Sequence, residues 1–234
     1  MEVEGYAASP TPRTGTDAPP AIELAGVQRR YGRHLVLRGI DLEVAPGRVV
    51  ALHGANGAGK TTLLRLLATR LRPSAGVARV FGHDLIRDGH LARTRLATVA
   101  VFGGAYGTLT ARENLHLATA LRGAPTDAID PALARVGLAR VGDHLVRTFS
   151  SGMRKRLALA RLLLSRADLW LLDEPHAALD TDGQALVDAL VAEARAAGTT
   201  VLMATHETTR SFDLADAVLL VDDGRLERVR RDDP

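Results

Sequence analysis

The stretch Gly-Ala-Asn-Gly-Ala-Gly-Lys-Thr at residues 54–61 decides how this chain folds. It fits the pattern Gly-x-x-x-x-Gly-Lys-[Ser/Thr], in which a glycine-rich turn lets successive backbone N–H groups surround phosphate oxygens. The apolar run before it, residues 48–52, predicts a strand, and a helix is expected to begin near Lys60 and to add the positive end of its dipole. Lys60 is expected to reach the β- and γ-phosphates of a nucleoside triphosphate, and the Thr61 hydroxyl to ligate Mg²⁺. The predicted triphosphate-binding residues are Gly54, Ala55, Asn56, Gly57, Ala58, Gly59, Lys60, Thr61 and Thr62.

Lysine is rare in this chain of 234 residues, since Lys60 and Lys155 are the only lysines among 30 basic residues. A lysine at position 60 therefore indicates that a compact, strongly hydrated charge is needed there. The 30 basic residues face 27 acidic ones, which leaves a net charge of +3, and no long block of like charges occurs. We therefore predict no nucleic-acid partner, and expect the densest basic cluster, Arg154-Lys155-Arg156, to be a solvated helix face.

Cysteine is absent, so neither a disulfide framework nor a thiolate metal site is expected. No apolar run approaches the roughly 18–20 residues of a transmembrane helix. Glu2 and Glu4, without an apolar segment after them, argue against a signal peptide. We expect the chain to work in the cytoplasm, so that at a membrane another chain would supply the bilayer segment.

The order of the predicted elements indicates a parallel α/β architecture. Residues 1–20 are proline-rich and predict a disordered tail, and residues 21–234 are expected to form a single domain. Strands alternate with helices after residue 48, which is typical of a parallel sheet. An early β cluster and a helical block at about 105–165 look like additions to that core. The expected strands are residues 22–24, 35–37, 40–44, 77–81, 169–172 and 200–204, with a hairpin at 217–229 and a helix at 184–197.

Helix caps can be assigned within the helical block. Thr110 and Glu113 form a capping-box pattern, in which the first residue caps the helix and the second bonds back to it. Asp130 is expected to cap the next helix, and another helix is expected after Ser150.

A second motif ends the predicted strand at residues 169–172. Asp173 and Glu174 follow it directly, at the carboxyl edge of the sheet, where nucleotides bind in such folds. Asp173 is expected to hold Mg²⁺ directly or through water. Glu174 is then placed to accept a proton from the attacking water as general base.

The sequence Phe149-Ser150-Ser151-Gly152-Met153, followed by Leu-Ala-Leu-Ala-Arg and Leu-Leu-Asp-Glu-Pro, resembles the ATPase subunits of ATP-binding cassette (ABC) transporters. The resemblance covers about residues 22–230. It implies a RecA-like P-loop NTPase core with an N-terminal antiparallel β subdomain and an inserted helical subdomain. The family signature is Leu-Ser-Gly-Gly-Gln, and this chain departs from it at Phe149, Ser151 and Met153.

The resemblance also implies roles for residues and partners. ATP with Mg²⁺ would bind between two copies in a head-to-tail homodimer, and an integral-membrane transporter subunit would hold the dimer peripherally at the cytoplasmic face of the membrane. The second copy would contribute Ser150, Ser151, Gly152 and Asp180 to each site. Tyr31 would stack on adenine, and His206 would contact the γ-phosphate and hold the attacking water. The glutamine that the family usually carries after the strand before the helical subdomain is absent, because Gln28 and Gln184 are the only glutamines.

Several functions fit these motifs. The run Asp173-Glu174-Pro175-His176 and its spacing to His206 look like the haem-exporter ATPase of cytochrome c maturation, and drug or antibiotic exporter ATPases share most of these features. A non-transport ABC ATPase, an unrelated phosphate-loop kinase and a nucleotide sensor with poor hydrolysis are the alternatives.

Overall fold

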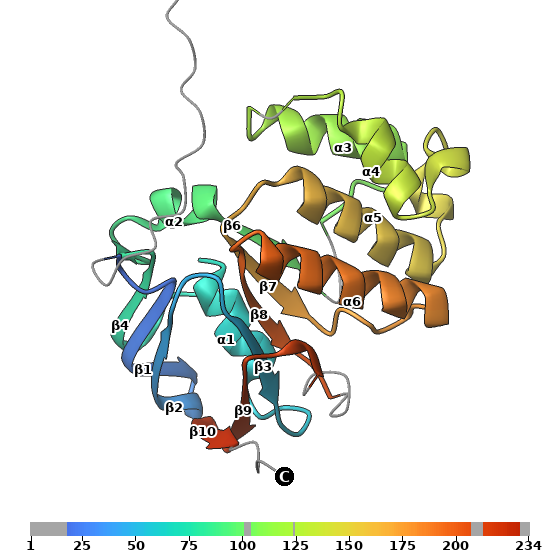
Figure 1. The fold of residues 1–234 in the computed structure, drawn as a ribbon. Helices are drawn as coiled ribbons and strands as arrows, with labels where there is room; N and C mark the ends of the chain where they lie inside the picture. The colour runs from blue at the N-terminus through green and yellow to red at the C-terminus, as the bar shows by residue number, and fades with distance from the viewer. Residues whose placement is uncertain (1–17, 101–103, 124, 207–212, 230–234) are drawn as a thin grey trace, which may run out of the picture.

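The computed structural model describes residues 18–100, 104–123, 125–206 and 213–229, and it contains two sheets (Figure 1). The smaller sheet is antiparallel, with strand order β2-β1-β4-β5. Its two long strands are paired over most of their length, from Ile22 opposite Val44 to Tyr31 opposite His34. These strands are β1 (Ile22–Tyr31), β2 (His34–Val44), β4 (Ala75–Val80) and β5 (His83–Asp84).

The larger sheet has the order β10-β9-β3-β8-β7-β6, and all its neighbouring strands are parallel except β10, which is antiparallel to β9. Its register aligns Ala204 with both Leu52 and Asp173, so the carboxyl ends of three central strands meet at one edge. The strands are β3 (Val49–His53), β6 (Leu96–Val99), β7 (Leu169–Asp173), β8 (Thr200–Ala204), β9 (Ala217–Asp222) and β10 (Arg225–Val229).

The larger sheet is buried on both faces. Along β7, Leu169 and Leu171 face one hydrophobic core, which they share with helix α1 (Lys60–Leu67) and the smaller sheet. Trp170 and Leu172 face a second core on the side of helices α5 (Ser151–Leu164) and α6 (Thr181–Ala196). Because side chains alternate across a strand, burial on both faces explains why β7 is a continuous apolar run. Figure 1 shows α5 and α6 lying together over that second face.

The helices have the following bounds: α2 is Gly89–Arg95, α3 is Ala111–Ala120, α4 is Ile129–Arg135, α5 is Ser151–Leu164 and α6 is Thr181–Ala196, with short 3-10 turns at Ala139–Val141 and Val146–Thr148. The described part of the expected helical block thus contains α3, α4 and α5. None of the helices in the described residues is both long and apolar enough to cross a membrane. The architecture is the α/β fold expected above, with an antiparallel β sheet beside the parallel core.

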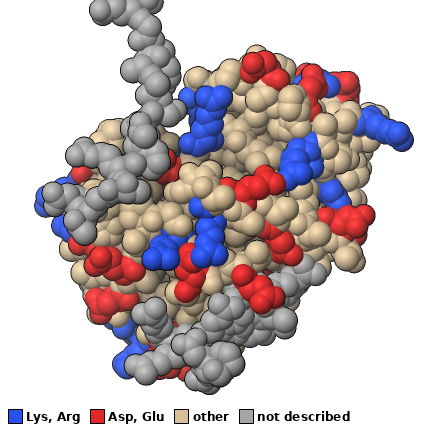
Figure 2. Space-filling view, viewed as in Figure 1, with Lys and Arg blue, Asp and Glu red and all other residues tan. Residues whose placement is uncertain are grey.

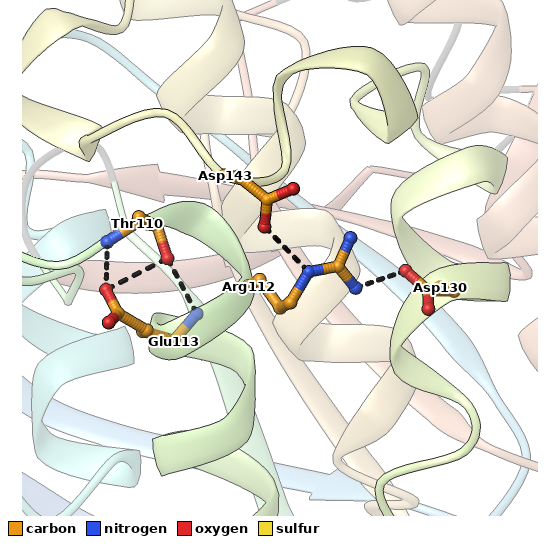
Figure 3. Close-up of polar contacts among 5 residues, drawn as sticks. All are labelled: Thr110, Arg112, Glu113, Asp130 and Asp143. Atoms are coloured by element: carbon orange, nitrogen blue, oxygen red, sulfur yellow. Dashed lines mark hydrogen bonds and ion pairs between the residues drawn. The ribbon is translucent and has the colours of Figure 1, made fainter.

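Two sets of side-chain contacts hold the start of α3 (Figure 3). The predicted capping box is confirmed, because the Glu113 N–H donates to the Thr110 hydroxyl at 3.1 Å and the Glu113 carboxylate accepts from the Thr110 N–H at 2.7 Å. Arg112 lies between the carboxylates of Asp143 and Asp130 and bonds both. The prediction that Asp130 caps the next helix is wrong. Ala128 occupies the N-cap of α4, and the Asp130 carboxylate is drawn across to Arg112 instead.

Charged side chains of both signs are interspersed on the face shown in Figure 2, without a continuous basic surface. The expectation that Arg154-Lys155-Arg156 is a solvated face is wrong for two of its three residues. Arg154 is exposed, whereas Lys155 is buried and Arg156 is partly buried. Both of these cations bond protein oxygens, since Lys155 donates to the Glu174 carbonyl and Arg156 to the Asp180 carboxylate.

Candidate nucleotide site

The phosphate loop joins the end of β3 to the start of α1, and two of its glycines are required by their surroundings. Gly54 has φ 142°, and a Cβ there would lie 2.2 Å from the carbonyl oxygen of Val221 on β9. Gly59 has φ 115°, and a Cβ there would lie 3.0 Å from Leu37 on β2. Because L-residues rarely adopt such φ values, both positions demand glycine. The loop is therefore shaped by strands from both sheets.

The loop is built to receive an anion. Helix α1 has no side-chain cap at Gly59, and within the described residues no protein acceptor pairs with the N–H of Gly57, Gly59 or Lys60. Unpaired amides at a helix N-terminus favour phosphate binding. The Lys60 side chain folds over the same loop, where its ammonium donates to the carbonyls of Gly54 at 2.6 Å and Ala55 at 3.0 Å. The donor set therefore fits the triphosphate expected from the sequence.

A cavity of about 200 Å³ brings the loop together with the predicted general base. Glu174, at the end of β7, lies on its wall although it is more than one hundred residues away along the chain. The residues that line the cavity are Asn56, Gly57, Gly59, Lys60, Thr61, Thr62 and Glu174.

The two predicted magnesium ligands are in direct contact. The Thr61 hydroxyl donates to a carboxylate oxygen of Asp173 at 3.1 Å. Burial raises the pKa of Asp173, and the neighbouring Glu174 charge raises it further, whereas the Thr61 hydrogen bond opposes them. No cluster of three or more acidic or histidine side chains suited to a metal occurs in the described part of the chain. One hydroxyl and one carboxylate fit Mg²⁺ that takes its other ligands from phosphates and water.

Glu174 is also paired with the predicted switch histidine. The Nδ1 of His206 lies 2.8 Å from a carboxylate oxygen of Glu174, and as the N–H tautomer it donates to that oxygen. The backbone of Glu174 has φ 47°, and its N–H donates to the Ala204 carbonyl at 2.8 Å. The β7 and β8 strand ends thus bring together the two residues that the sequence assigned to catalysis.

His53 is a site residue that the sequence analysis missed. It ends β3 directly before the phosphate loop, and it is 7% exposed. Burial lowers its pKa, Lys60 and His206 lower it further, and Glu174 raises it. The signal was its position, because it is the last residue before the glycine-rich turn, but a lone histidine fits no motif.

The elements predicted to contact a second copy's nucleotide lie outside this cavity. Ser150 caps α5 by accepting the Met153 N–H at 3.2 Å, and Ser150 and Ser151 are both exposed. Two departures from the family signature point into the protein, since Phe149 is buried and Met153 packs against the core. They therefore leave the serine hydroxyls and the helix N-terminus exposed.

Asp180 caps α6 in a similar way. Its carboxylate accepts the Gly183 N–H at 2.9 Å and an Arg156 N–H at 2.7 Å. These two bonds lower the pKa of Asp180, the Gly183 bond most. The loop between β7 and α6 is thereby fixed against α5.

Tyr31 is not part of the cavity wall, and the stretch that lacks the family's glutamine is described only in part. Tyr31 ends β1, is 42% exposed and has the Arg29 guanidinium 4.6 Å from its ring centre. It does not line the cavity, so stacking on adenine stays a prediction. Part of the stretch without glutamine, residues 101–103, lies outside the described residues.

Comparisons with known proteins agree with this geometry. The sequence model of the family described as "ABC transporter" matches residues 37–177. The daunorubicin resistance ATP-binding protein DrrA3 of Streptomyces coeruleorubidus is 41% identical over 214 residues, covering 89% of this chain and 67% of that protein. The cytochrome c biogenesis ATP-binding export protein CcmA of Methylococcus capsulatus is 42% identical over 193 residues, covering 82% and 92%.

A relative named for Nod factor export also matches. The Nod factor export ATP-binding protein I of Ralstonia nicotianae is 34% identical over 218 residues, covering 92% of this chain and 68% of that protein. The solved structure of an ATP-binding subunit of an ABC transporter superposes with a TM-score of 0.85 at 25% identity, covering 91% of this chain and 90% of that one. The chain thus spans about two thirds of the length of the drug-resistance and Nod-factor relatives.

Proposed function

We propose a function from the premise that this chain belongs to the ABC transporter family: it hydrolyses ATP between two head-to-tail copies and powers export through a separate integral-membrane subunit. The ATP-binding subunits of this family are ATPases, and this chain is one. The observation that carries the proposal is that Glu174 lines the same cavity as the phosphate loop.

The residues around the cavity have separate tasks in the proposed reaction. The loop amides and Lys60 bind the phosphates and offset their charge. Thr61 and Asp173 would hold Mg²⁺, which supplies charge stabilisation at the β- and γ-phosphates when bound. Glu174 accepts the proton of the attacking water, and the His206 hydrogen bond keeps its carboxylate aimed at that water.

A second copy completes each site. Ser150, Ser151 and Gly152 offer two hydroxyls and the N-terminus of a 14-residue helix, all on an accessible edge of the protein. These groups suit a γ-phosphate that approaches from another chain. Asp180 lies close by, since Arg156 of α5 bonds its carboxylate, and it would line the same interface. Two-fold symmetry then makes two identical composite sites.

A second cavity, of about 500 Å³, supports a docking place for the membrane subunit. It lies between the segment after α1, α2 and β6 on one side and α3 and α5 on the other, and its lining includes Arg70, Arg93, Arg122 and Arg161. In the described part of the chain these four guanidiniums bond only neutral oxygens, and none has a carboxylate partner. An acidic segment of the membrane subunit would complement them, and would hold this chain peripherally at the cytoplasmic face.

Charge reversal tests this docking place. Arg70→Glu and Arg93→Glu should reduce co-purification with the membrane subunit from detergent-solubilised membranes. Arg87→Glu is the matched control, because Arg87 is exposed but does not line the cavity. If all three variants recover the same amount of membrane subunit, the membrane subunit does not dock at this cavity.

Export is the role named for two of the three relatives. The matching proteins are named for daunorubicin resistance, cytochrome c biogenesis export and Nod factor export. We propose that the cargo is haem, exported for cytochrome c maturation, on the resemblance around residues 173–180 and 204–207, with a drug or antibiotic as the alternative. Identification of the integral-membrane protein that co-purifies with this chain separates the two.

The decisive experiment is Glu174→Gln, with Glu43→Gln on the exposed side of β2 as a like-for-like control. The wild-type chain and the control should release phosphate from ATP and Mg²⁺, whereas Glu174→Gln should lose about 10²–10⁴-fold of that rate, as expected for a general base. The variant should also form an ATP-dependent dimer on size-exclusion chromatography. A wild-type chain that neither releases phosphate nor self-associates with ATP would refute the proposed motor, and a monomer that phosphorylates an added acceptor would indicate a kinase.

A further inference from the structure

Lys155 is a buried cation that the proposed reaction does not use. It lies in the second turn of α5 and is 7% exposed. Its ammonium donates to the backbone carbonyl of Glu174 at 2.8 Å. Burial lowers its pKa, and the carboxylates of Asp173 and Glu174 raise it. Burying an ammonium group costs free energy unless it is paired and hydrogen-bonded. Lysine occurs at only one other position in the chain, Lys60 in the phosphate loop.

The peptide that Lys155 bonds is conformationally strained. Glu174 is not glycine, yet its φ is 47°, in the left-handed region that costs L-residues roughly 1–2 kcal/mol. Such a conformation persists only where its surroundings hold it. The Ala204 carbonyl accepts the Glu174 N–H at 2.8 Å, and the Glu174 carbonyl accepts from both Lys155 and the Ala177 N–H, the latter at 3.2 Å. Lys155 is therefore one of three hydrogen-bond partners that fix this backbone.

The same helix begins at the residues predicted to meet the second copy's nucleotide. Ser150 caps α5, and Lys155 follows Ser151 by four residues, which is about one helical turn or 6 Å. Two neighbours of Lys155 also contact the loop after Glu174. A Cβ on Gly152 would lie 3.0 Å from the Ala178 carbonyl, and Arg156 bonds Asp180 at 2.7 Å. The first turns of α5 and the Glu174 loop thus form one connected unit.

We propose that Lys155 is a positioning residue that links the two ATP sites: it ties the helix that contacts one nucleotide to the carboxylate that acts on the other. This inference rests on the proposed function. Docking of the partner's triphosphate on Ser150 and Gly152 fixes the N-terminus of α5, and the Lys155 hydrogen bond passes that placement to Glu174. Each site then becomes fully active only when its own chain also engages the opposite nucleotide, which makes hydrolysis cooperative in ATP.

The test compares Lys155→Met with Arg154→Met, which removes the exposed cation next to it on the same helix. In the purified chain, Lys155→Met should lower kcat by about 10- to 100-fold, the effect expected when a catalytic group is misplaced by about 1 Å. ATP affinity, measured by equilibrium binding, should change little, because Lys155 does not line the cavity. The Hill coefficient for ATP hydrolysis should fall towards one. Arg154→Met should match the wild type in all three measurements.

A rescue variant separates positioning from folding. Lys155→Arg keeps a donor for the Glu174 carbonyl and should recover most of the rate and the cooperativity. If Lys155→Met loses activity only in proportion to its loss of ATP-binding protein, or if its kcat and Hill coefficient equal those of Arg154→Met, the inference is wrong. If Lys155→Met fails in this way while Glu174→Gln still abolishes hydrolysis in the same assay, only the role of Lys155 is refuted and the proposed function stands. Normal hydrolysis by Glu174→Gln would instead overturn the proposed function.

Discussion

Asn114, in α3, offers a quantitative test of how the helical region is held together. It is 3% exposed, and its side chain closes a loop onto the start of the helix. The amide oxygen accepts the Tyr106 N–H at 2.7 Å, and the amide nitrogen donates to the carbonyls of Tyr106 at 3.0 Å and Thr110 at 2.8 Å. Asn114→Ala removes these three bonds at once, together with a longer one from the amide nitrogen to the Leu109 carbonyl at 3.4 Å.

The expected loss in the free energy of unfolding depends on which hydrogen bonds the partners of Asn114 keep in the variant. The Tyr106 carbonyl still accepts from the Leu109 N–H at 3.2 Å, and the Thr110 carbonyl still accepts from the Asn114 N–H at 3.0 Å. Only the Tyr106 N–H loses its protein acceptor. Two to three bonds of about 1 kcal/mol each, with one amide left unpaired, give a loss of about 2–3 kcal/mol in the free energy of unfolding. For a domain of this size that lowers the Tm by about 4–12 °C.

Thr119→Val is the matched control, because Thr119 lies on the same helix and is 1% exposed. Its hydroxyl donates to the carbonyls of Leu115 at 3.1 Å and His116 at 2.9 Å, which both accept helical N–H groups already. We expect its cost to stay below about 1 kcal/mol. Urea unfolding followed by circular dichroism measures both. Losses within about 0.5 kcal/mol of each other would refute the reasoning from unpaired groups.

Three further outcomes are expected. Gly54→Ala should abolish ATP binding, measured with a fluorescent analogue, because its Cβ would lie 2.2 Å from the Val221 carbonyl. Gly57→Ala is the control and should weaken binding less, because a Cβ there meets nothing within 4 Å. Equal losses of binding in the two variants would contradict the clash at Gly54. Burial is the main cause that lowers the pKa of His53 from 6.5, so protonation of His53 disfavours the folded state. The stability should therefore be fully present above pH 6.5 and fall as the pH drops towards the folded pKa. His53→Gln should flatten that fall in pH-dependent unfolding, and an unchanged profile would count against it. Arg112→Gln should lower the free energy of unfolding by less than about 1 kcal/mol, measured by thermal unfolding. It breaks two ion pairs, but both carboxylates are largely exposed. A loss above about 2 kcal/mol would show that the three charges form a network stronger than surface ion pairs.

The strands of the parallel core could be predicted because strands that are buried on both faces have continuous apolar runs in the sequence. The strand residues 169–172 and 201–204 are apolar on both faces, and each face packs into a different hydrophobic core. Helix ends were harder, since they depend on which partner a polar side chain finds. Helix α6 begins at Thr181 rather than at the expected residue 184, because Asp180 caps it and Gly183 is tolerated inside its first turn. Asp130 fits a cap in sequence, but Arg112 attracts its carboxylate in the fold.

The candidate site divides in the same way. The phosphate loop, Asp173 and Glu174 were predicted because each belongs to a motif with fixed spacing and a defined chemical task. Lys155 was placed on a solvated face, because its partner is a backbone carbonyl whose position only the tertiary structure determines. His53 carried no spacing pattern, and its importance follows from burial beside Lys60.

The hairpin of β9 and β10 has a consequence for how the chain is made. Val221 borders Gly54 of the phosphate loop, and Gly224 lies so close to β2 that a Cβ on it would be 2.2 Å from the Val36 carbonyl. These residues are synthesised long after the phosphate loop, yet they border it in the folded protein. A growing chain would carry the entire glycine-rich motif well before it could bind nucleotide, and this capacity would arrive only after β9 and β10 had been added.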